Sequence, residues 1–164
     1  MPDHPTVVER TAQPYAAIAA VVTMQNIGEV LPPLHPKLAA WLDRAGASIV
    51  GEPFFKYNVI DMERAMEVEV GFPIARAVDG DDSVVTNVLP AGRYATAYHH
   101  GHPADLVPAV AALLQWADDE GLVWDMHPTP KGDAWGCRLE IYETNPPADM
   151  NDWKTQLAFR LADT

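Results

Sequence analysis

The sequence has 164 residues, of which 48% are hydrophobic and 21% are charged, and its formal net charge at pH 7 is -12. This length and composition favour one folded domain over a disordered chain, and the negative charge disfavours direct binding to nucleic acid. Cys137 is the single cysteine, which excludes an internal disulfide, and neither a signal peptide nor a membrane-spanning apolar run is evident. We expect a cytoplasmic protein that does not bind a membrane.

The first half of the chain predicts a strand, a helix and two further strands. Residues 6–23 are rich in Val, Ala and Thr, which favours a strand, bent at Pro14. From Leu31 to Ala45 apolar residues recur at helical spacing, and Gly46 is placed to end this helix. Alternating residues then predict two strands, over 51–60 and over 66–70, the second closed by Gly71-Phe72-Pro73.

The second half repeats this arrangement after a loop at Asp79-Gly80-Asp81-Asp82. Residues 84–98 predict an extended segment interrupted by Pro90-Ala91-Gly92, and a helix follows Pro103 and runs to about Glu120. The remaining segments predict a hairpin of residues 122–126 and 134–143, with a loop over 127–133, and a last strand over 153–161.

Residues 137–142 alternate strictly, so their side chains point to two faces of one strand. Cys137, with Leu139 and Ile141, is expected to face a core, where packing rather than nucleophilic chemistry is its role. Arg138, Glu140 and Tyr142 face the other way. A carboxylate such as Glu140 in a cleft can neutralise a bound cation, or act as a general base if burial raises its pKa. An ordinary solvent-exposed pair of side chains is the alternative for Glu140 and Tyr142.

Two features indicate an internal repeat. The apolar stripe of the second helix repeats that of the first at an offset of 72 residues, and the segment Glu67 to Pro73 resembles Glu140 to Pro146 at an offset of 73. We therefore predict one α+β domain over residues 1–164, built from pseudo-repeat halves at about 6–78 and 83–162.

Other residues offer weaker candidates for a site. Glu67 and Glu69 share the face opposite their strand's apolar residues, which favours a solvated edge, although Glu69 is retained as a candidate ligand contact. Trp124 and Trp135 flank the loop before the alternating strand and are candidates for a pocket wall. His99-His100-Gly101-His102 is more typical of a polar turn than of a metal site, and no phosphate-binding loop or nucleophile elbow occurs, so we expect no cofactor and no metal.

Taken together, the ordered motifs resemble the GyrI-like small-molecule-binding family, the effector-binding domain of AraC- and MerR-type regulators. The resemblance covers about residues 8 to 162. The matching segments are Gly51 to Phe55, Met66 to Pro73, Leu89 to Tyr94, Gly101, Trp116, Leu139 to Tyr142 with Asn145-Pro146, and Trp153 to Thr155. No helix-turn-helix is evident in the sequence, so the chain resembles the stand-alone form of the family, and Arg160 stands where the last strand of the family often has proline.

The resemblance implies a fold and a site. Two pseudo-twofold-related strand-helix-hairpin modules would form an antiparallel sheet, with two helices on one face and a ligand cleft on the other. The acidic ligand contact of the family maps to Glu140, with Tyr142 beside it. Aromatic pocket walls are typical of the family, and Phe55, Tyr57, Trp124 and Trp135 are the candidates here.

Three functions follow from the resemblance and stay open. The first is a receptor that holds an apolar, in some cases cationic, aromatic drug or metabolite against Glu140. The second is a hydrolase of electrophilic cyclopropane-bearing natural products that uses Glu140 with a tyrosine, Tyr142 or Tyr57. The third is an acidic interaction protein with gyrase or a separate regulator as its partner. A haem-binding relative of similar fold ranks last, because it depends only on the histidines.

Overall fold

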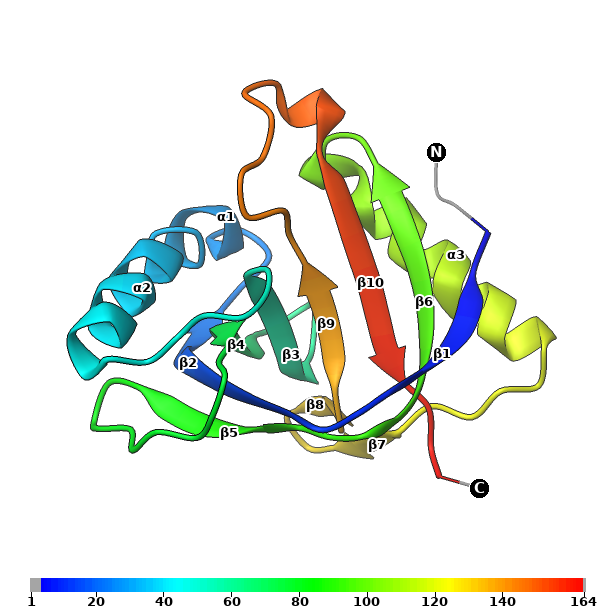
Figure 1. The fold of residues 1–164 in the computed structure, drawn as a ribbon. Coiled ribbons are helices and arrows are strands. Elements are labelled where there is room, and N and C mark those ends of the chain that lie inside the picture. The colour runs from blue at the N-terminus through cyan, green and yellow to red at the C-terminus, as the bar shows by residue number, and fades with distance from the viewer. Residues whose placement is uncertain (1–3, 164) are drawn as a thin grey trace.

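The computed structural model describes residues 4–163, whose strands form one curled antiparallel sheet with two main helices (Figure 1). The elements of the first half are β1 (Thr6–Arg10), β2 (Gln13–Val22), α1 (Ile27–Val30), α2 (Leu34–Ala45), β3 (Phe54–Ile60), β4 (Met66–Pro73) and β5 (Val85–Leu89). Those of the second half are β6 (Gly92–His100), the 3-10 turn η1 (Pro103–Asp105), α3 (Leu106–Asp119), β7 (Met126–Thr129), β8 (Gly132–Trp135), β9 (Arg138–Ile141), the 3-10 turn η2 (Met150–Asp152) and β10 (Lys154–Arg160).

The order of strands across the sheet places the two halves of the chain side by side. The order is β1-β6-β10-β9-β3-β4-β2-β5, and the β7–β8 hairpin joins β3 through β8. The two central strands, β9 and β3, come from different halves and pair antiparallel, with Phe55 opposite Glu140. The α+β class predicted from the sequence is confirmed. This strand order is compatible with a pseudo-twofold relation between the halves, which stays a prediction.

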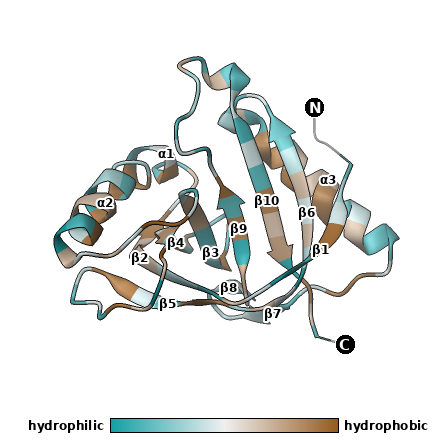
Figure 2. Ribbon diagram, in the orientation of Figure 1, coloured by the Kyte–Doolittle hydropathy of each residue, from teal (hydrophilic) through white to brown (hydrophobic). Residues whose placement is uncertain are grey.

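The two helices pack over the flanks of the sheet. Leu38 and Leu42 of α2 are fully buried against residues of β2 and β4, among them Phe72. On the other flank, Leu113 of α3 is buried with Leu157 of β10. Both helices mix hydrophobic and hydrophilic residues (Figure 2), as expected of helices that bury one stripe against a sheet. No helix of residues 4–163 is long and apolar enough to cross a bilayer.

The central strands β3 and β9 therefore lie between the helices rather than beneath one (Figure 1). On the face away from the helices, Phe54 and Leu139 belong to a second core with Tyr15 and Tyr94, beside a small hollow of about 270 Å³. The predicted position of the ligand cleft, on the face opposite the helices, is wrong. That face is occupied largely by this core, and the main cavity opens between the helices on their own face.

Two predicted elements differ in detail. The hairpin pairs β7 with β8 across a turn at residues 130–131, after which Gly132 begins β8 with a φ of 131°. The predicted loop over 127–133 is therefore largely strand, and residues 134–143 are divided between β8 and β9. Strand β8 ends before Gly136, whose N–H donates to the Asp125 carbonyl at 2.8 Å. A separate strand, β9, then begins at Arg138 and lies between β3 and β10. The opening strand is interrupted before Pro14, which lies within β2 beside the edge strand β5.

Truncation of a fully buried α2 side chain should test the packing of the flanks. We expect Leu42→Ala to lower the free energy of unfolding by about 2–5 kcal/mol, because it removes apolar contacts and leaves a cavity. Val123 is 69% exposed and offers a matched control. Val123→Ala should change the free energy of unfolding by less than about 0.5 kcal/mol. Urea unfolding followed by circular dichroism measures both. Equal effects of the two substitutions would contradict this packing of α2.

Candidate ligand-binding site

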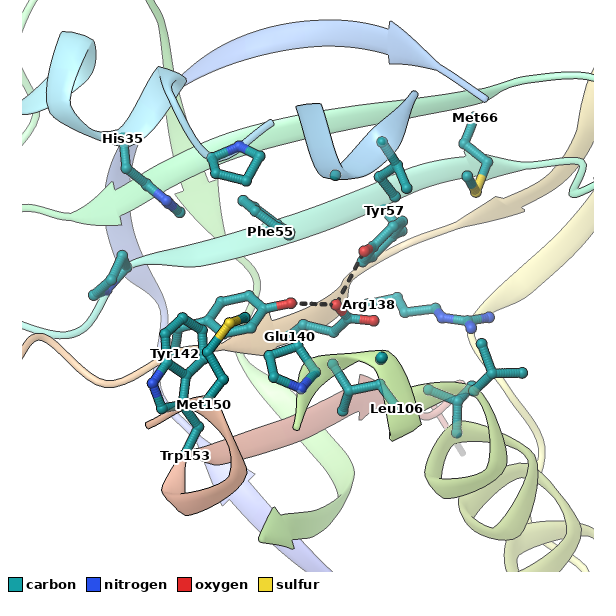
Figure 3. Close-up of a pocket in the computed structure, with 18 of the residues that line it drawn as sticks. His35, Phe55, Tyr57, Met66, Leu106, Arg138, Glu140, Tyr142, Met150 and Trp153 are labelled. Atoms are coloured by element: carbon teal, nitrogen blue, oxygen red, sulfur yellow. Dashed lines mark hydrogen bonds between the residues drawn. The ribbon is translucent and has the colours of Figure 1, made fainter. Parts of the chain in front are cut away.

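A cavity of about 610 Å³ lies over the central strands, within the range typical of small-molecule sites. Its floor comes from β3 and β9, one wall from α1 and α2, the other from η1 and α3, and the segment around η2 closes one end (Figure 3). The cavity exists because each helix covers one flank, so the side chains of the central seam meet a gap instead of a packed helix.

Most of the lining is apolar. Four methionines take part, which suits irregular ligands because the thioether side chain is flexible and polarizable. Aliphatic residues of α1 and α3 and one tryptophan complete the apolar surface, and the main apolar contributors are Met24, Ile27, Phe55, Ile60, Met62, Met66, Leu106, Val107, Val110, Met150 and Trp153.

Glu140 places a carboxylate on the floor of this cavity, and Glu143 is a second acidic residue of the lining. Its Oε1 accepts hydrogen bonds from the Tyr142 hydroxyl at 2.7 Å and from the Tyr57 hydroxyl at 3.0 Å (Figure 3). The three residues come from two strands and the segment after β9, so the pairing of β3 with β9 assembles the group. Both tyrosines donate to the same oxygen, and within residues 4–163 no hydrogen bond is made to Oε2.

The electrostatics of this group follow from its burial. Desolvation raises the pKa of Glu140, while the hydrogen bonds from Tyr142 and Tyr57 and the charge of Arg138 act in the opposite direction. Burial beside the carboxylate raises the pKa of both tyrosines, so their hydroxyls keep their protons and remain donors. Burial also lowers the pKa of Arg138, with Glu140 opposing that change.

A flat aromatic surface lies next to the carboxylate. The ring of Phe55 stacks on that of His35, with centroids 5.2 Å apart and planes 4° from parallel, and it meets Tyr142 edge-on at 5.0 Å. His35 Nε2 lies 3.1 Å from the carbonyl oxygen of Phe54, and burial lowers the pKa of its imidazole. At neutral pH the imidazole is therefore an uncharged part of this wall, suited to a planar apolar ligand.

The structure brings four of the predicted site residues together and places three elsewhere. Glu140, Tyr142, Phe55 and Tyr57 all line the cavity. Glu69 does not. It stands opposite Lys56 in the register of β3 and β4, and its side chain lies on the other face of the sheet. There it accepts hydrogen bonds from Tyr15 at 2.5 Å and Asn58 at 2.6 Å.

Trp124 and Trp135 also lie outside the cavity lining. Their rings are 5.5 Å apart and both pack against Phe159, in the core beneath α3. The hairpin containing Trp135 turns this side chain toward β10. Trp135 affects the site only indirectly, because its ring contacts the guanidinium group of Arg138.

Several lining residues were not predicted. Arg138 was expected on the same face as Glu140, but no role was assigned to it. The methionines stand in four separate segments, and His35 lies on a helix that shows only a packing stripe, so no local pattern marks them. Trp153 was assigned to the last strand. It lies just before β10 and faces the cavity with η2 (Figure 3).

Among residues 4–163 no group of three or more His, Cys, Asp or Glu side chains could hold a metal ion. In the histidine cluster, His99 Nε2 lies 3.1 Å from the His102 carbonyl oxygen, and His102 Nδ1 accepts from the Ala104 N–H, so these two rings make local turn contacts.

A curled antiparallel sheet with helices on its flanks and an apolar cavity over the seam defines an α+β small-molecule-binding domain. The chain belongs to the GyrI-like family: the model of the GyrI-like small molecule binding domain matches residues 4–162. No curated protein matches the sequence.

Solved structures share the fold. The EcmrR C-terminal domain is 18% identical with a TM-score of 0.74, and the match covers 98% of each chain. In the EcmrR–DNA complex the TM-score is 0.76 at 18% identity, and the match covers 98% of this chain but 58% of the EcmrR chain. SAV2435 bound to tetraphenylphosphonium is 9% identical, with a TM-score of 0.65 and coverage of 98% and 94%. A protein from Listeria innocua named a hydrolase is 16% identical, with a TM-score of 0.63 and coverage of 96% and 91%.

The raised pKa of Glu140 predicts a pH-dependent cost of keeping this carboxylate in the cavity. A carboxyl group whose pKa rises on folding stabilises the protein at low pH, and this contribution is lost as pH rises from about 4.5 through the raised value. Glu140→Gln should therefore have a higher free energy of unfolding than wild type at pH 8, with a smaller difference at pH 4. Urea unfolding at both values measures this, with Glu67→Gln as control. A wild type that is more stable than Glu140→Gln at pH 8 would contradict it.

Proposed function

We propose that this domain binds an apolar aromatic molecule, cationic in the simplest case, in the cavity between α2 and α3. The observation that supports this most is the placement of one carboxylate, Glu140, on the floor of a largely apolar cavity, with two tyrosine hydroxyls holding it. Keeping a partly desolvated carboxylate is unfavourable for folding alone, as its raised pKa indicates. A ligand that offers a positive charge or an N–H group to Oε2 would offset this cost.

The relatives support the same function. The family model describes a small molecule binding domain, and SAV2435 was solved with tetraphenylphosphonium, a bulky aromatic cation without hydrogen-bond donors. Such a cation would contact the aromatic surface of Phe55 and Tyr142, and it would be attracted by Glu140 without a directional bond. A link to transcriptional control, as the EcmrR–DNA complex suggests for its own chain, would require further protein segments or a separate regulator.

Binding of tetraphenylphosphonium tests the electrostatic part of the proposal. Truncating one member of a desolvated charge pair costs about 2–5 kcal/mol, so Glu140→Gln should raise the Kd by about 30-fold or more. Glu67→Gln, which changes a strand glutamate on the other face of the sheet, should leave the Kd unchanged. Calorimetry measures both affinities, and quenching of Trp153 fluorescence offers a second readout because this residue lines the cavity.

Two outcomes would count against this function. Wild type that does not bind tetraphenylphosphonium or other aromatic cations would remove the proposed ligand class. Equal affinities of wild type and Glu140→Gln would remove the role of the carboxylate, while leaving apolar binding in place.

A hydrolase is the second candidate, favoured by the combination of a carboxyl group with a raised pKa and two phenolic donors in one cavity. Glu140 would accept a proton from the attacking water, and a tyrosine would donate a hydrogen bond to the carbonyl oxygen on which charge grows. It ranks second because both phenols donate to Glu140, so one of them would have to exchange this bond for one to the substrate.

Incubation with an electrophilic cyclopropane-bearing compound distinguishes binding without reaction from hydrolysis. If the protein is a hydrolase, mass spectrometry should show addition of one water at a rate proportional to enzyme. Glu140→Ala should lower this rate by about 100-fold or more, the scale of general-base catalysis. A compound that is bound and recovered unchanged would contradict hydrolysis of that substrate.

A further inference from the structure

We propose that Arg138 forms an acceptor subsite beside Glu140, so that the preferred ligand is a dipolar aromatic molecule: a cationic or N–H group at Glu140 and a carboxylate, phenolate or carbonyl oxygen at Arg138. This inference rests on the proposed function and specifies its ligand class.

Arg138 is held rigidly at the cavity wall. Its side chain is 7% exposed, and its guanidinium carbon lies 4.5 Å from the ring centroid of Phe159 and 4.8 Å from that of Trp135. Phe159 stands directly opposite Arg138 in the β9–β10 pairing, so the register of the sheet sets this contact. Aromatic rings hold a guanidinium group in place by cation–π attraction, but they do not use its N–H donors in the ring plane.

The donors of Arg138 have no hydrogen-bond acceptor among residues 4–163. In the part of the chain that the structure describes, its side chain makes no hydrogen bond and no ion pair with a carboxylate within 4.0 Å. Its nitrogens are also not among the fully enclosed polar atoms that lack a partner, and Arg138 is one of the residues that line the cavity. A buried arginine is normally paired. The guanidinium of this one lies against two rings in a residue that lines the cavity, with Glu140 and Asp133 as the carboxylates whose charges act on it, so its N–H donors are available to a ligand acceptor.

Arg138 and Glu140 do not neutralise each other by direct contact. They are two residues apart on the same face of β9, which separates their backbones by about 7 Å. The Glu140 carboxylate is turned toward Tyr57 and Tyr142, while the Arg138 side chain extends along the cavity away from it (Figure 3). Strand β9 thus presents a negative group and a positive group side by side, a pattern that a dipolar molecule complements and that a simple cation complements only at Glu140. Glu143 and Lys154 also line the cavity, with Lys154 Nζ 4.3 Å from the ring centroid of Tyr98.

A matched pair of xanthene dyes tests this: a rhodamine free acid, a zwitterion at neutral pH, and its ethyl ester, a cation with the same ring system. Wild type should bind the acid about tenfold more tightly than the ester, because a charge-assisted bond to Arg138 is available only to the carboxylate. In Arg138→Met, which keeps an apolar stem against the rings, the affinity for the acid should fall by about tenfold and that for the ester should not fall. Arg76→Met, at an exposed arginine outside the cavity, is the control and should keep the wild-type ratio.

Glu140→Gln separates this inference from the proposed function, since it should weaken both dyes while the acid-to-ester ratio is kept. If both dyes bind and Arg138→Met leaves their ratio unchanged, the acceptor subsite is overturned and the proposed function stands. If wild type binds neither dye but binds tetraphenylphosphonium, the acceptor subsite is overturned and the proposed function stands; if it binds none of the three, both proposals fail. Should Arg138→Met not fold, as judged by circular dichroism, the wild-type ratio decides alone, and a preference for the ester overturns the subsite.

Discussion

The pairing of β3 with β9 is the constraint on which the site depends. It joins the two halves of the chain at the centre of the sheet and places Phe55 opposite Glu140, so that Tyr57 reaches the carboxylate from the neighbouring strand. Since α2 and α3 each cover one flank, neither of these two helices packs on the centre of this seam. The same arrangement therefore creates the cavity and supplies its polar floor. A shift of one residue in the pairing would turn Glu140 or its partner to the other face and remove the site altogether.

The charges of the cavity are local and differ from those of the whole chain. The net charge of the whole chain is -12. This charge attracts cations at long range, but salt screens the attraction. Inside the cavity, Arg138 faces the same space as Glu140, and the two differ in how they are held. Glu140 is fixed by hydrogen bonds, whereas Arg138 is fixed by the rings of Trp135 and Phe159 and donates no hydrogen bond to any of residues 4–163. Specificity would then arise from the spacing of two groups on one strand.

Local patterns in the sequence predicted the elements and the faces of the central strand, because both follow from periodicity within a few residues. The alternation around Glu140 is confirmed by the cavity on one side and the core with Leu139 on the other. What failed depends on contacts between distant segments. Glu69 alternates as regularly as Glu140. The register of β3 and β4, in which Glu69 stands opposite Lys56, places it on the face away from the cavity. Trp135 is turned into the core by a hairpin whose register no local pattern specifies.

Whether the cavity holds its ligand or reacts with it depends on the hydrogen bonds of Glu140. A general base needs a free oxygen and a pKa near the working pH, and burial moves the pKa of Glu140 in that direction. The hydrogen bonds from Tyr142 and Tyr57 act against it, because they stabilise the charged form, as does the charge of Arg138. Desolvation outweighs these effects, so the pKa of Glu140 stays above its usual value. Both phenols already donate to this carboxylate, which makes it better suited to balancing a bound positive group than to working as a general base with a free phenol beside it. We therefore favour binding over hydrolysis.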